Sequence, residues 1–413
     1  MKKKLLLITS RFPYPPIGGD RLKNYNLIKI LSKNFDVTLI VINLETIRYS
    51  DINAIKKYVK NIKIFNISKI YAYINVIKNL FFSKEPLQIG YYYYSYIQEY
   101  IDKEIDKYDF VISTLIRTAK YLENTDKLKF LDIVDSIGLN YTKSQENVKS
   151  FFWKFIYKIE ANRLLKYEKK YIKMFDNTFF VNRDESEYYK KYGNTLWLPN
   201  GVNEKLFTYD KYDKKYNSYI AFLGNMSYQP NVDAVLWFVN NVFPLLDKNI
   251  KFIIIGKNPK RKIKNLEKKF KNIEVTGFLE DPYKILNSVF ATVAPMQTGG
   301  GIQNKILEAM ALGQICITSS LAGKSIYGAI DKRDFIIEDE PNDYANIIND
   351  IFRNRNKYKY LKINAKNFII KNYTWKNYEK KLFKSLWLTY NTKNYLSSLV
   401  KTPQLKFMEK YSV

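Results

Sequence analysis

Two series of short apolar runs, separated by helical segments, constrain the fold of this chain more than any other feature. The first series lies at residues 5–8, 37–42, 110–113, 130–134 and 178–181. The second series lies at residues 219–223, 252–255, 273–275, 291–294 and 315–318. Strands that are apolar along their whole length, rather than in alternation, are typical of parallel sheets covered by helices on both faces. We therefore predict an α/β chain built from two doubly wound domains.

A polar and charged segment without an apolar face, residues 200–217, separates the two series. We place an N-terminal domain at 1–198, a linker at 199–217, a C-terminal domain at 218–373, and a helix with a tail at 374–413. Thr374 can cap this helix, whose apolar stripe is broad enough to face a core. The residues from Asn391 onward show no clear periodicity, which predicts a loosely ordered tail.

Charge and residue usage exclude several classes of function. The chain has 68 Lys and Arg against 40 Asp and Glu, a formal net charge of +28, which indicates an anionic partner or a compositional bias of the genome. It has no histidine and one cysteine, Cys316, which excludes histidine-based triads, imidazole-ligated zinc and a disulfide framework. No apolar run reaches the ~18–20 residues of a membrane span, and the N-terminal run is too short for a secretory signal. We expect a cytoplasmic protein.

The segment 295–313 carries the strongest chemical signal. A strand ends at Pro295, three consecutive glycines follow at 299–301, and a helix is predicted from near Ile302 to Gly313. Glycines let the backbone approach a ligand closely, and a helix N-terminus attracts anions. Lys305 on the first turn can add a charge to a phosphate, and Glu308, about two turns in, can accept both hydroxyls of a ribose. A plain tight turn with a solvated Glu308 is the alternative.

This segment resembles the donor-binding motif of family 4 glycosyltransferases of the GT-B fold. Matching segments follow in the expected order at 198–202, 222–226, 255–259 and 275–278. Residues 228–234 are similar to a bacterial branch used in surface polysaccharide assembly. The resemblance implies a GT-B fold, with two Rossmann-like domains facing a cleft and a C-terminal helix crossing back to the N-terminal domain.

The same resemblance implies an activity. A sugar would pass from a nucleotide-sugar donor to a saccharide or lipid-linked acceptor, with retention, in capsule, lipopolysaccharide or exopolysaccharide biosynthesis. Neither a cofactor nor a metal is expected, and no nucleic-acid-binding motif is present. The alternatives are a catalytically silent GT-B scaffold and a basic protein that binds membranes or polyanions.

The resemblance also implies site residues. The donor is assigned to Gly224, Asn225, Lys257, Gly299, Gly300, Gly301, Ile302, Gln303, Lys305 and Glu308, the last two also as catalytic residues. The acceptor or phosphate loop is assigned to Gly18, Gly19, Asp20 and Arg21, with Asp20 as the N-cap of a helix. The chain departs from the family in three ways, one of which is that it lacks the histidine that many relatives place in the N-domain cleft. Gly300 stands where the family has the first of two glutamates, and Asn225 and Gln229 fall where it has a basic pair.

Two further segments complete the expectations. Asp135 follows the strand 130–134, where open α/β sheets bind ligands, so we predict a catalytic role for it in the cleft, with an N-cap role as the alternative. The stretch 143–173 is basic and rich in aromatic residues. It predicts either an interfacial helix on the anionic inner face of the plasma membrane or a core helix with a solvated lysine face.

Overall fold

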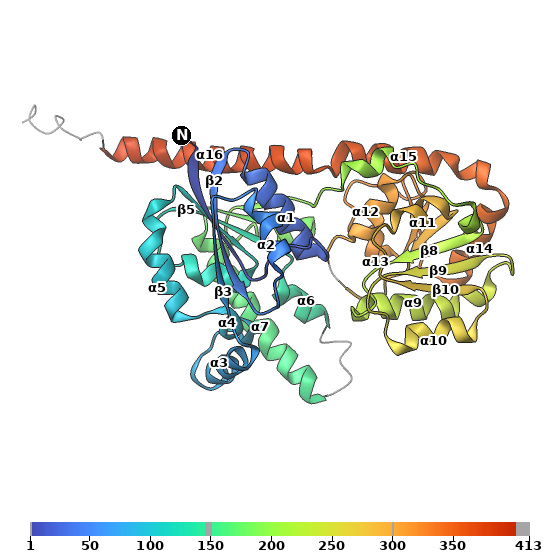
Figure 1. The fold of residues 1–413 in the computed structure, drawn as a ribbon, viewed down its shortest axis with the longest axis horizontal. Coiled ribbons are helices and arrows are strands. Elements are labelled where there is room, and N and C mark those ends of the chain that lie inside the picture. Colours follow the sequence, from blue (N-terminus) through green and yellow to red (C-terminus); the bar gives the residue numbers. More distant parts are fainter. Residues whose placement is uncertain (1, 145–150, 300, 402–413) are drawn as a thin grey trace, which may run out of the picture.

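The computed structural model describes residues 2–144, 151–299 and 301–401. The N-terminal domain contains strands β1 Lys3–Thr9, β2 Phe35–Asn43, β3 Asn61–Asn66, β4 Phe110–Thr114, β5 Leu128–Val134, β6 Asn177–Phe180 and β7 Thr195–Trp197. The C-terminal domain contains β8 Tyr219–Leu223, β9 Lys251–Ile255, β10 Ile273–Gly277, β11 Ala291–Ala294, β12 Cys316–Thr318 and β13 Ile336–Ile337. The two domains lie next to each other and are joined by the linker and one long helix (Figure 1).

Both sheets are parallel and have the doubly wound strand order. The N-terminal sheet runs β3-β2-β1-β4-β5-β6-β7, and the C-terminal sheet runs β10-β9-β8-β11-β12-β13. In each sheet the strand order reverses beside the first strand, between β1 and β4 and between β8 and β11. Ligands of open α/β sheets bind at such a reversal, at the carboxyl ends of the strands. The predicted α/β class with two doubly wound domains is therefore confirmed.

Helices cover both faces of each sheet. Those of the N-terminal domain are α1 Gly19–Leu31, α2 Tyr49–Lys56, α3 Lys69–Phe82, α4 Leu87–Tyr92, α5 Ser95–Glu104, α6 Ile137–Ser144, α7 Phe151–Met174 and α8 Arg183–Tyr189. Those of the C-terminal domain are α9 Gln229–Asn241, α10 Arg261–Lys269, α11 Tyr283–Ser288, α12 Asn304–Ala311, α13 Ser320–Gly323, α14 Pro341–Arg353 and α15 Lys359–Asn372. Helix α16, Trp375–Lys401, ends the described chain.

Alternate residues of β1 show how the N-terminal sheet is buried on both sides. Leu6 and Ile8 belong to a core cluster with α4, α5 and α7, whereas Leu5 and Leu7 belong to a second cluster with α1 and α16. All four side chains are fully buried. This two-sided burial explains why the strand reads as a continuous apolar run.

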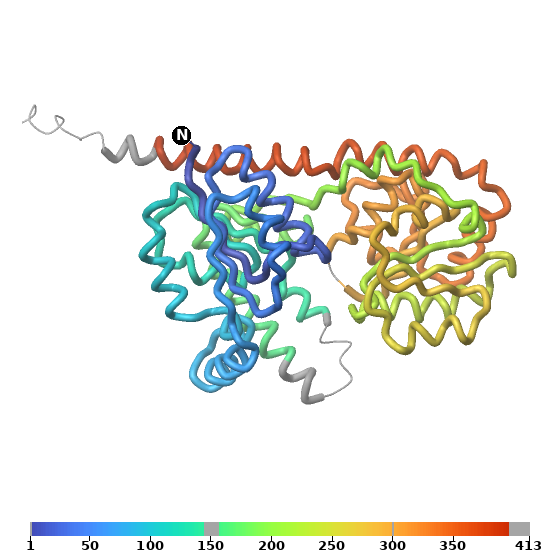
Figure 2. The backbone as a smooth tube through the Cα atoms, in the orientation of Figure 1, coloured from blue at the N-terminus to red at the C-terminus, as the bar shows by residue number. Residues whose placement is uncertain are grey.

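Helix α16 crosses from the C-terminal domain back to the N-terminal domain, as expected. Its residues Tyr378, Leu382 and Leu386 are buried in the N-terminal core, and the red end of the chain runs along that domain (Figure 2). The backbone N–H of Asn377 donates to Thr374 Oγ1 at 3.1 Å, so Thr374 caps the helix. A parallel β-bridge between Val202 of the linker and Thr374 joins the two segments that connect the domains.

Several boundaries differ from the sequence prediction. Helix α1 begins at Gly19 with Gly18 as N-cap, so Asp20 lies in the first turn and is not the cap. The linker contacts the core, because Val202 and Leu206 are buried there. The tail expected from Asn391 is helical as far as Lys401, because α16 continues along the N-terminal domain.

Candidate active site

The glycine-rich loop after β11 leads directly to the opposite domain. Gly299 and Gly301 have φ values of 110° and 76°, a backbone conformation that favours glycine. A Cβ atom placed on Gly301 would lie 2.7 Å from Asp135 Oδ1, so the loop touches the carboxylate that follows β5. Ile302 packs on Leu115 and Val134 of the N-terminal domain. The carboxyl ends of the two sheets therefore face each other at this loop. Gly300 lies outside the described residues.

Helix α12 begins at Asn304, two residues later than predicted, with Gln303 as an N-cap whose side chain makes no capping bond. The first N–H groups of the helix therefore remain available to an anion. Because of the later start, Glu308 lies about one turn into the helix rather than two. Lys305 and Glu308 are thus presented from the same first turns of α12.

Lys305 stands at the strand reversal of the C-terminal sheet. Its Nζ donates to Asn231 Oδ1 at 2.6 Å and lies 4.5 Å from the centre of the Phe222 ring on β8. Asn231 Nδ2 in turn donates to the Asn225 carbonyl at 3.0 Å. Burial lowers the pKa of Lys305 to about 7. A bound phosphate would raise this pKa again, because an anion favours the charged form.

Glu308 and Tyr283 form a second polar pair on the C-terminal side. Burial raises the pKa of Glu308 to about 7, and the nearby Tyr283 hydroxyl opposes that rise. Burial, with the charge of Glu308, raises the pKa of Tyr283 well above its usual value. Both side chains line a large cavity, so Glu308 can receive hydroxyl groups of a ligand there.

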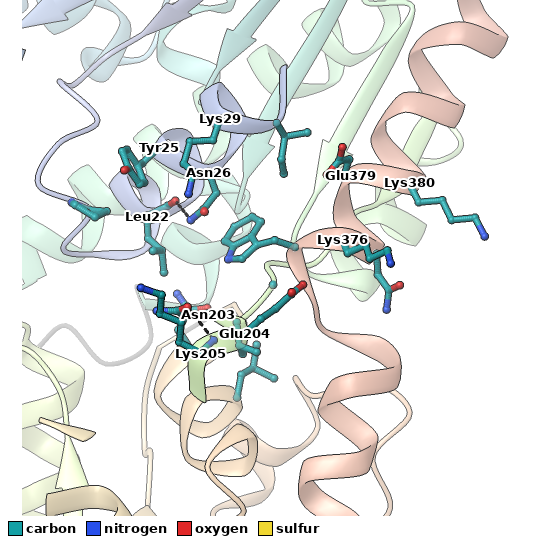
Figure 3. A pocket seen from close by; sticks show the side chains of 18 of the residues that line it. Leu22, Tyr25, Asn26, Lys29, Asn203, Glu204, Lys205, Lys376, Glu379 and Lys380 are labelled. Carbon is teal, nitrogen blue, oxygen red and sulfur yellow. Dashed lines mark hydrogen bonds between the residues drawn. The ribbon is translucent and has the colours of Figure 1, made fainter. Parts of the chain in front are cut away.

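This cavity lies between the domains and has a volume of about 1460 Å³. Figure 3 shows its walls. The side chains of α1 stand on one side, those of the linker lie opposite, and those of α16 close a third side. Its lysines are Lys29 of α1, Lys33 in the turn after α1, Lys205 of the linker, and Lys376 and Lys380 of α16. Glu204 and Glu379 also line the edge, and Lys33 pairs with Glu379, so lysines outnumber acidic residues there. Glu308 lies on the C-terminal side.

Asp135 is the least satisfied carboxylate at the domain contact. Its Oδ1 is buried without a hydrogen-bond partner among the described residues. Burial raises the pKa of Asp135, and the nearby Lys23 ammonium opposes that rise. The N–H of Leu139 donates to Ser136 Oγ at 3.0 Å, so Ser136 rather than Asp135 caps α6. The N-cap alternative for Asp135 is therefore wrong.

Buried carboxylates and a lysine surround Asp135. Lys23 Nζ lies 2.5 Å from Asp132 Oδ1 in a fully buried ion pair. The Ser136 N–H donates to Glu185 Oε2 at 2.7 Å, and Ser136 Oγ donates to Glu168 Oε2 at 2.7 Å. Burial raises the pKa of both glutamates, and the charge of Asp135 adds to the rise for Glu185. The site thus crowds three carboxyl groups, Asp135, Glu168 and Glu185, whose pKa values are all raised chiefly by burial.

The predicted acceptor or phosphate loop, residues 18–21, forms ion pairs within the N-terminal domain. Arg11 Nη1 lies 3.1 Å from Asp20 Oδ2, and the Arg21 guanidinium pairs with Glu45. Gly18, with φ of 106°, lets the chain turn into α1, and Gly19 has open space around it. Asp20 and Arg21 are therefore occupied by protein partners in this structure.

Two predicted donor residues make different contacts from those expected. The Asn225 side chain accepts from Ser227 N–H at 3.1 Å and shapes the turn before α9. Lys257 meets this turn through its backbone carbonyl, which accepts from Met226 N–H at 2.9 Å. Its ammonium group forms no hydrogen bond or ion pair with any residue that the structure describes. Gly224 contacts Gly256 so closely that a Cβ on Gly256 would lie 1.6 Å from the Gly224 carbonyl oxygen.

Sequence reasoning missed the partners of the predicted residues. Asn231, Tyr283 and Glu185 lie far along the chain from the groups they touch, and only Asn231 lies within a recognised segment, 228–234. Among the described residues, no group of three or more Asp, Glu, Cys or His side chains is arranged to hold a metal ion.

Comparisons with known proteins agree with this architecture. Residues 217–354 match the family model described as "Glycosyl transferases group 1". A Klebsiella pneumoniae protein, described as an uncharacterized 44.6 kDa protein in the cps region, is 27% identical over 405 residues, which are 93% of this chain and 98% of that protein.

Solved structures resemble the whole chain. Sucrose-phosphate synthase from Thermosynechococcus elongatus matches with a TM-score of 0.68 at 14% identity. The match covers 95% of this chain and 100% of the synthase chain. Anabaena HepE in complex with UDP-glucose has a TM-score of 0.62 at 12% identity, covering 93% and 99%. WaaG, described as a glycosyltransferase involved in lipopolysaccharide biosynthesis, has a TM-score of 0.63 at 14% identity, covering 91% and 98%.

The fold and the arrangement of the site define a two-domain GT-B protein. The match of residues 217–354 to the group 1 glycosyl transferases, together with this fold, identifies the chain as a glycosyltransferase of the GT-B type.

Proposed function

We propose that this glycosyltransferase moves a sugar from a nucleotide-sugar to a saccharide or lipid-linked acceptor, with retention, in the synthesis of a cell-surface polysaccharide. One observation carries the proposal. Lys305 and Glu308 project from the first turns of α12, and the glycine loop before this helix touches Asp135 of the other domain. The cps-region relative and the neighbours in complex with UDP or UDP-glucose support this choice of substrate and pathway.

In this proposal the donor lies along α12. The pyrophosphate occupies the uncapped N-terminus of the helix, where N–H groups and Lys305 stabilise the charge that develops as the nucleoside diphosphate leaves. The ribose hydroxyls donate to the Glu308 carboxylate, which lines the cavity together with Tyr283. These groups balance the phosphate charge without a divalent ion, so we expect catalysis to be independent of metal.

In this proposal Asp135 binds a sugar hydroxyl. The family resemblance expects a glutamate at position 300, where this chain has glycine. The Asp135 carboxylate reaches the same loop from the opposite domain, at Gly301, and its Oδ1 has no protein partner among the described residues. A hydroxyl of the donor sugar or of the acceptor would satisfy this buried oxygen, because an unpaired buried polar atom is costly.

The interdomain cavity holds the rest of the substrates. Its volume of about 1460 Å³ exceeds the ~300–1,000 Å³ typical of a site for one small ligand. It therefore has room for the nucleoside against Glu308 and for part of a saccharide acceptor. The lysines at its edge suit an acceptor that carries phosphate or carboxylate groups.

The test is a screen of nucleotide-sugars for hydrolysis and transfer, combined with thermal denaturation. Nucleoside diphosphates should raise the melting temperature of the wild type, because a ligand of the folded state stabilises it. Glu308→Gln should lose this effect, and the matched Glu204→Gln, at the linker side of the cavity, should keep it. Stabilisation without turnover of any donor would favour a catalytically silent scaffold. Stabilisation by heparin but not by nucleotides would favour a polyanion-binding protein.

The proposal places the protein in the cytoplasm, at the inner face of the plasma membrane. No helix in the described part of the chain is long and apolar enough to cross a membrane. A peripheral contact would have to come from the surface, where the net charge of +28 attracts anionic lipid. Residues 145–150 of the stretch 143–173 lie outside the described residues, as do the side chains at 151–156. The later part of α7 packs into the core through Leu164 and Tyr171, so there the core alternative holds.

A further inference from the structure

Helix α3 has its polarity inverted relative to a normal surface helix. Eight large apolar side chains between Ile70 and Phe82 are exposed, with Phe81 and Phe82 at 74% and 89% of their full accessibility. The exposed set is Ile70, Tyr71, Tyr73, Ile74, Ile77, Leu80, Phe81 and Phe82. In globular proteins the apolar stripe of a helix faces the core. Here Ala72 is the only fully buried residue of the helix.

The inward face of α3 is polar, and specific bonds fix it in place. Asn75 Nδ2 donates to the Gly90 carbonyl at 2.5 Å and to the Tyr93 carbonyl at 2.9 Å. Asn79 Nδ2 donates to the Pro86 carbonyl at 3.2 Å. A Cβ on Gly90 would lie 2.6 Å from Asn79 Nδ2, so α3 packs closely on α4. Rotating the helix to bury its apolar face would break these bonds, so its outward orientation is determined by the fold.

The charge of the same helix is uniformly positive. Residues 69–84 contain Lys69, Lys78 and Lys84 and no acidic residue. All three lysines are exposed, and none forms an ion pair with another described residue. Lysines that flank exposed aromatic and aliphatic side chains are the composition of a helix that lies in a membrane interface.

Tyr71 stacks on Tyr94 and Tyr73 packs on Tyr91, and the position of α3 leaves the rest of this face free. Figure 1 shows the helix at the end of the N-terminal domain opposite α16, where α7 also projects beyond the sheet. The two regions are linked, because Leu87 N–H at the start of α4 donates to Glu160 of α7 at 2.8 Å. The face is remote from the interdomain cavity, which is lined by α1, the linker and α16.

We infer that α3 docks the protein on an anionic lipid bilayer, with Ile74, Ile77, Phe81 and Phe82 inserted among the acyl chains and the lysines against lipid phosphates. A second copy of the chain fits less well. A helix of 14 residues is about 21 Å long and about 10 Å wide, far below the ~800 Å² per partner of a stable dimer. Docking would bring the protein to a lipid-linked acceptor at the same surface. This biological role rests on the proposed function, whereas membrane binding by α3 does not.

The chain offers a direct probe of insertion. Its single cysteine, Cys316, is buried, so a cysteine introduced on α3 is the accessible thiol. Ile77→Cys, labelled with an environment-sensitive fluorophore, should brighten and shift to the blue on vesicles of phosphatidylglycerol and phosphatidylcholine. The matched control is Ile363→Cys on α15, where the native side chain is 61% exposed, compared with 55% for Ile77. The label at 363 should not respond.

Binding is then measured by co-sedimentation with the same vesicles. Phe81→Ser with Phe82→Ser should reduce the partition constant onto the vesicles at least tenfold, because two inserted aromatic rings are lost. Ile363→Ser with Leu388→Ser, which removes two apolar side chains that are 61% and 64% exposed elsewhere, should change it less than twofold. Lys78→Glu should weaken binding to phosphatidylglycerol and leave the weaker binding to pure phosphatidylcholine unchanged. All variants should keep the wild-type melting temperature, since the replaced side chains are exposed.

Three results would overturn the inference. The first is that the wild type does not bind phosphatidylglycerol vesicles at low salt. The second is that the serine variants bind as tightly as the wild type. The third is that the protein is a dimer in solution and that Phe81→Ser with Phe82→Ser dissociates it. Nucleoside diphosphate stabilisation and turnover of a soluble acceptor analogue, measured on the same variants, test the proposed function separately. Vesicle binding without any nucleotide response would support α3 docking and reject the transferase chemistry.

Discussion

Replacing Lys305 with methionine should weaken nucleotide-sugar binding and at the same time stabilise the protein. The Lys305 ammonium is buried, its neighbours Asn231 and Phe222 carry no charge, and it forms no ion pair with any described residue. Burial without a counter-charge lowers its pKa to about 7. Methionine keeps the length and apolar character of the stem but removes the charge that is unfavourable in the free protein.

The two effects have calculable sizes and signs. A charge-assisted hydrogen bond to phosphate is worth ~1.5–3 kcal/mol, so Lys305→Met should bind the donor about 10- to 150-fold more weakly. The folded-state pKa of Lys305 is about 7, against 10.5 for an ordinary lysine. Between these values the unfolded chain holds the extra proton, so the wild type gains stability as the pH rises. The stability advantage of Lys305→Met should therefore be largest below pH 7 and shrink towards pH 10.

The pH dependence of binding separates Lys305 from Glu308. As the pH rises above 7, Lys305 loses its proton and phosphate binding weakens, whereas Glu308, whose pKa is also raised to about 7, ionises and accepts better from a ribose. The two slopes partly cancel in the wild type. Donor affinity of Glu308→Gln should fall between pH 6.5 and 8.5, because only Lys305 titrates. Donor affinity of Lys305→Met should rise over the same range.

Titration calorimetry with the nucleotide-sugar selected by the hydrolysis screen measures these affinities, since an intact nucleotide-sugar has no phosphate that titrates near pH 7. Thermal denaturation at matched pH gives the stabilities. Lys248→Met, at an exposed lysine of the same domain, is the control for loss of a positive charge. Donor affinity of Lys305→Met within twofold of the wild type would refute the phosphate role. Equal slopes for Glu308→Gln and Lys305→Met would refute the pKa assignments.

Four further results are expected. Asp135→Asn should lower kcat at least ~100-fold with little change in donor affinity, as steady-state kinetics would show. Gly301→Ala should lose turnover, because its Cβ would meet the Asp135 carboxylate at 2.7 Å, whereas Gly328→Ala, with a similar positive φ of 87° but ordinary contacts, should keep it. Lys23→Met should lower the free energy of unfolding in urea by ~3–5 kcal/mol, since it leaves Asp132 buried without its partner, and Lys23→Met with Asp132→Leu should recover part of the loss. Excess EDTA should leave transfer unchanged, and loss of activity restored by magnesium would contradict the proposed phosphate stabilisation.

The fold was largely predictable because burial on both faces leaves a readable signal. Each of the ten predicted apolar runs coincides with a strand of the structure, and only residues 181 and 315 fall just outside β6 and β12. The three strands that were missed lack this signal. Strand β3, at the edge of its sheet, reads Asn-Ile-Lys-Ile-Phe-Asn and is only partly buried, whereas β7 and β13 have three and two residues. Short or half-exposed edge strands do not form a continuous apolar run.

The site was predictable only where its residues are adjacent in sequence. Lys305 and Glu308 follow from a local pattern of glycines and a helix start. The contact of Asp135 with Gly301 joins residues of different domains, and no local pattern encodes it. The α3 surface was missed for another reason. Its apolar positions satisfy a helical pattern, and only the structure shows that Asn75 and Asn79 occupy the inward face.

The contact between Gly301 and Asp135 explains why one short loop must serve two purposes. With φ of 76° and only 2.7 Å between a Cβ at this position and Asp135 Oδ1, residue 301 cannot carry a side chain while the domains are in contact. The same bare backbone is what an anionic ligand needs in order to approach the start of α12. Ile302, the next residue, packs on Leu115 and Val134 of the opposite domain, so an apolar contact holds the loop where the glycine allows the carboxylate to reach it. Binding geometry and domain contact therefore depend on the same pair of residues, and a change at either one must disturb both.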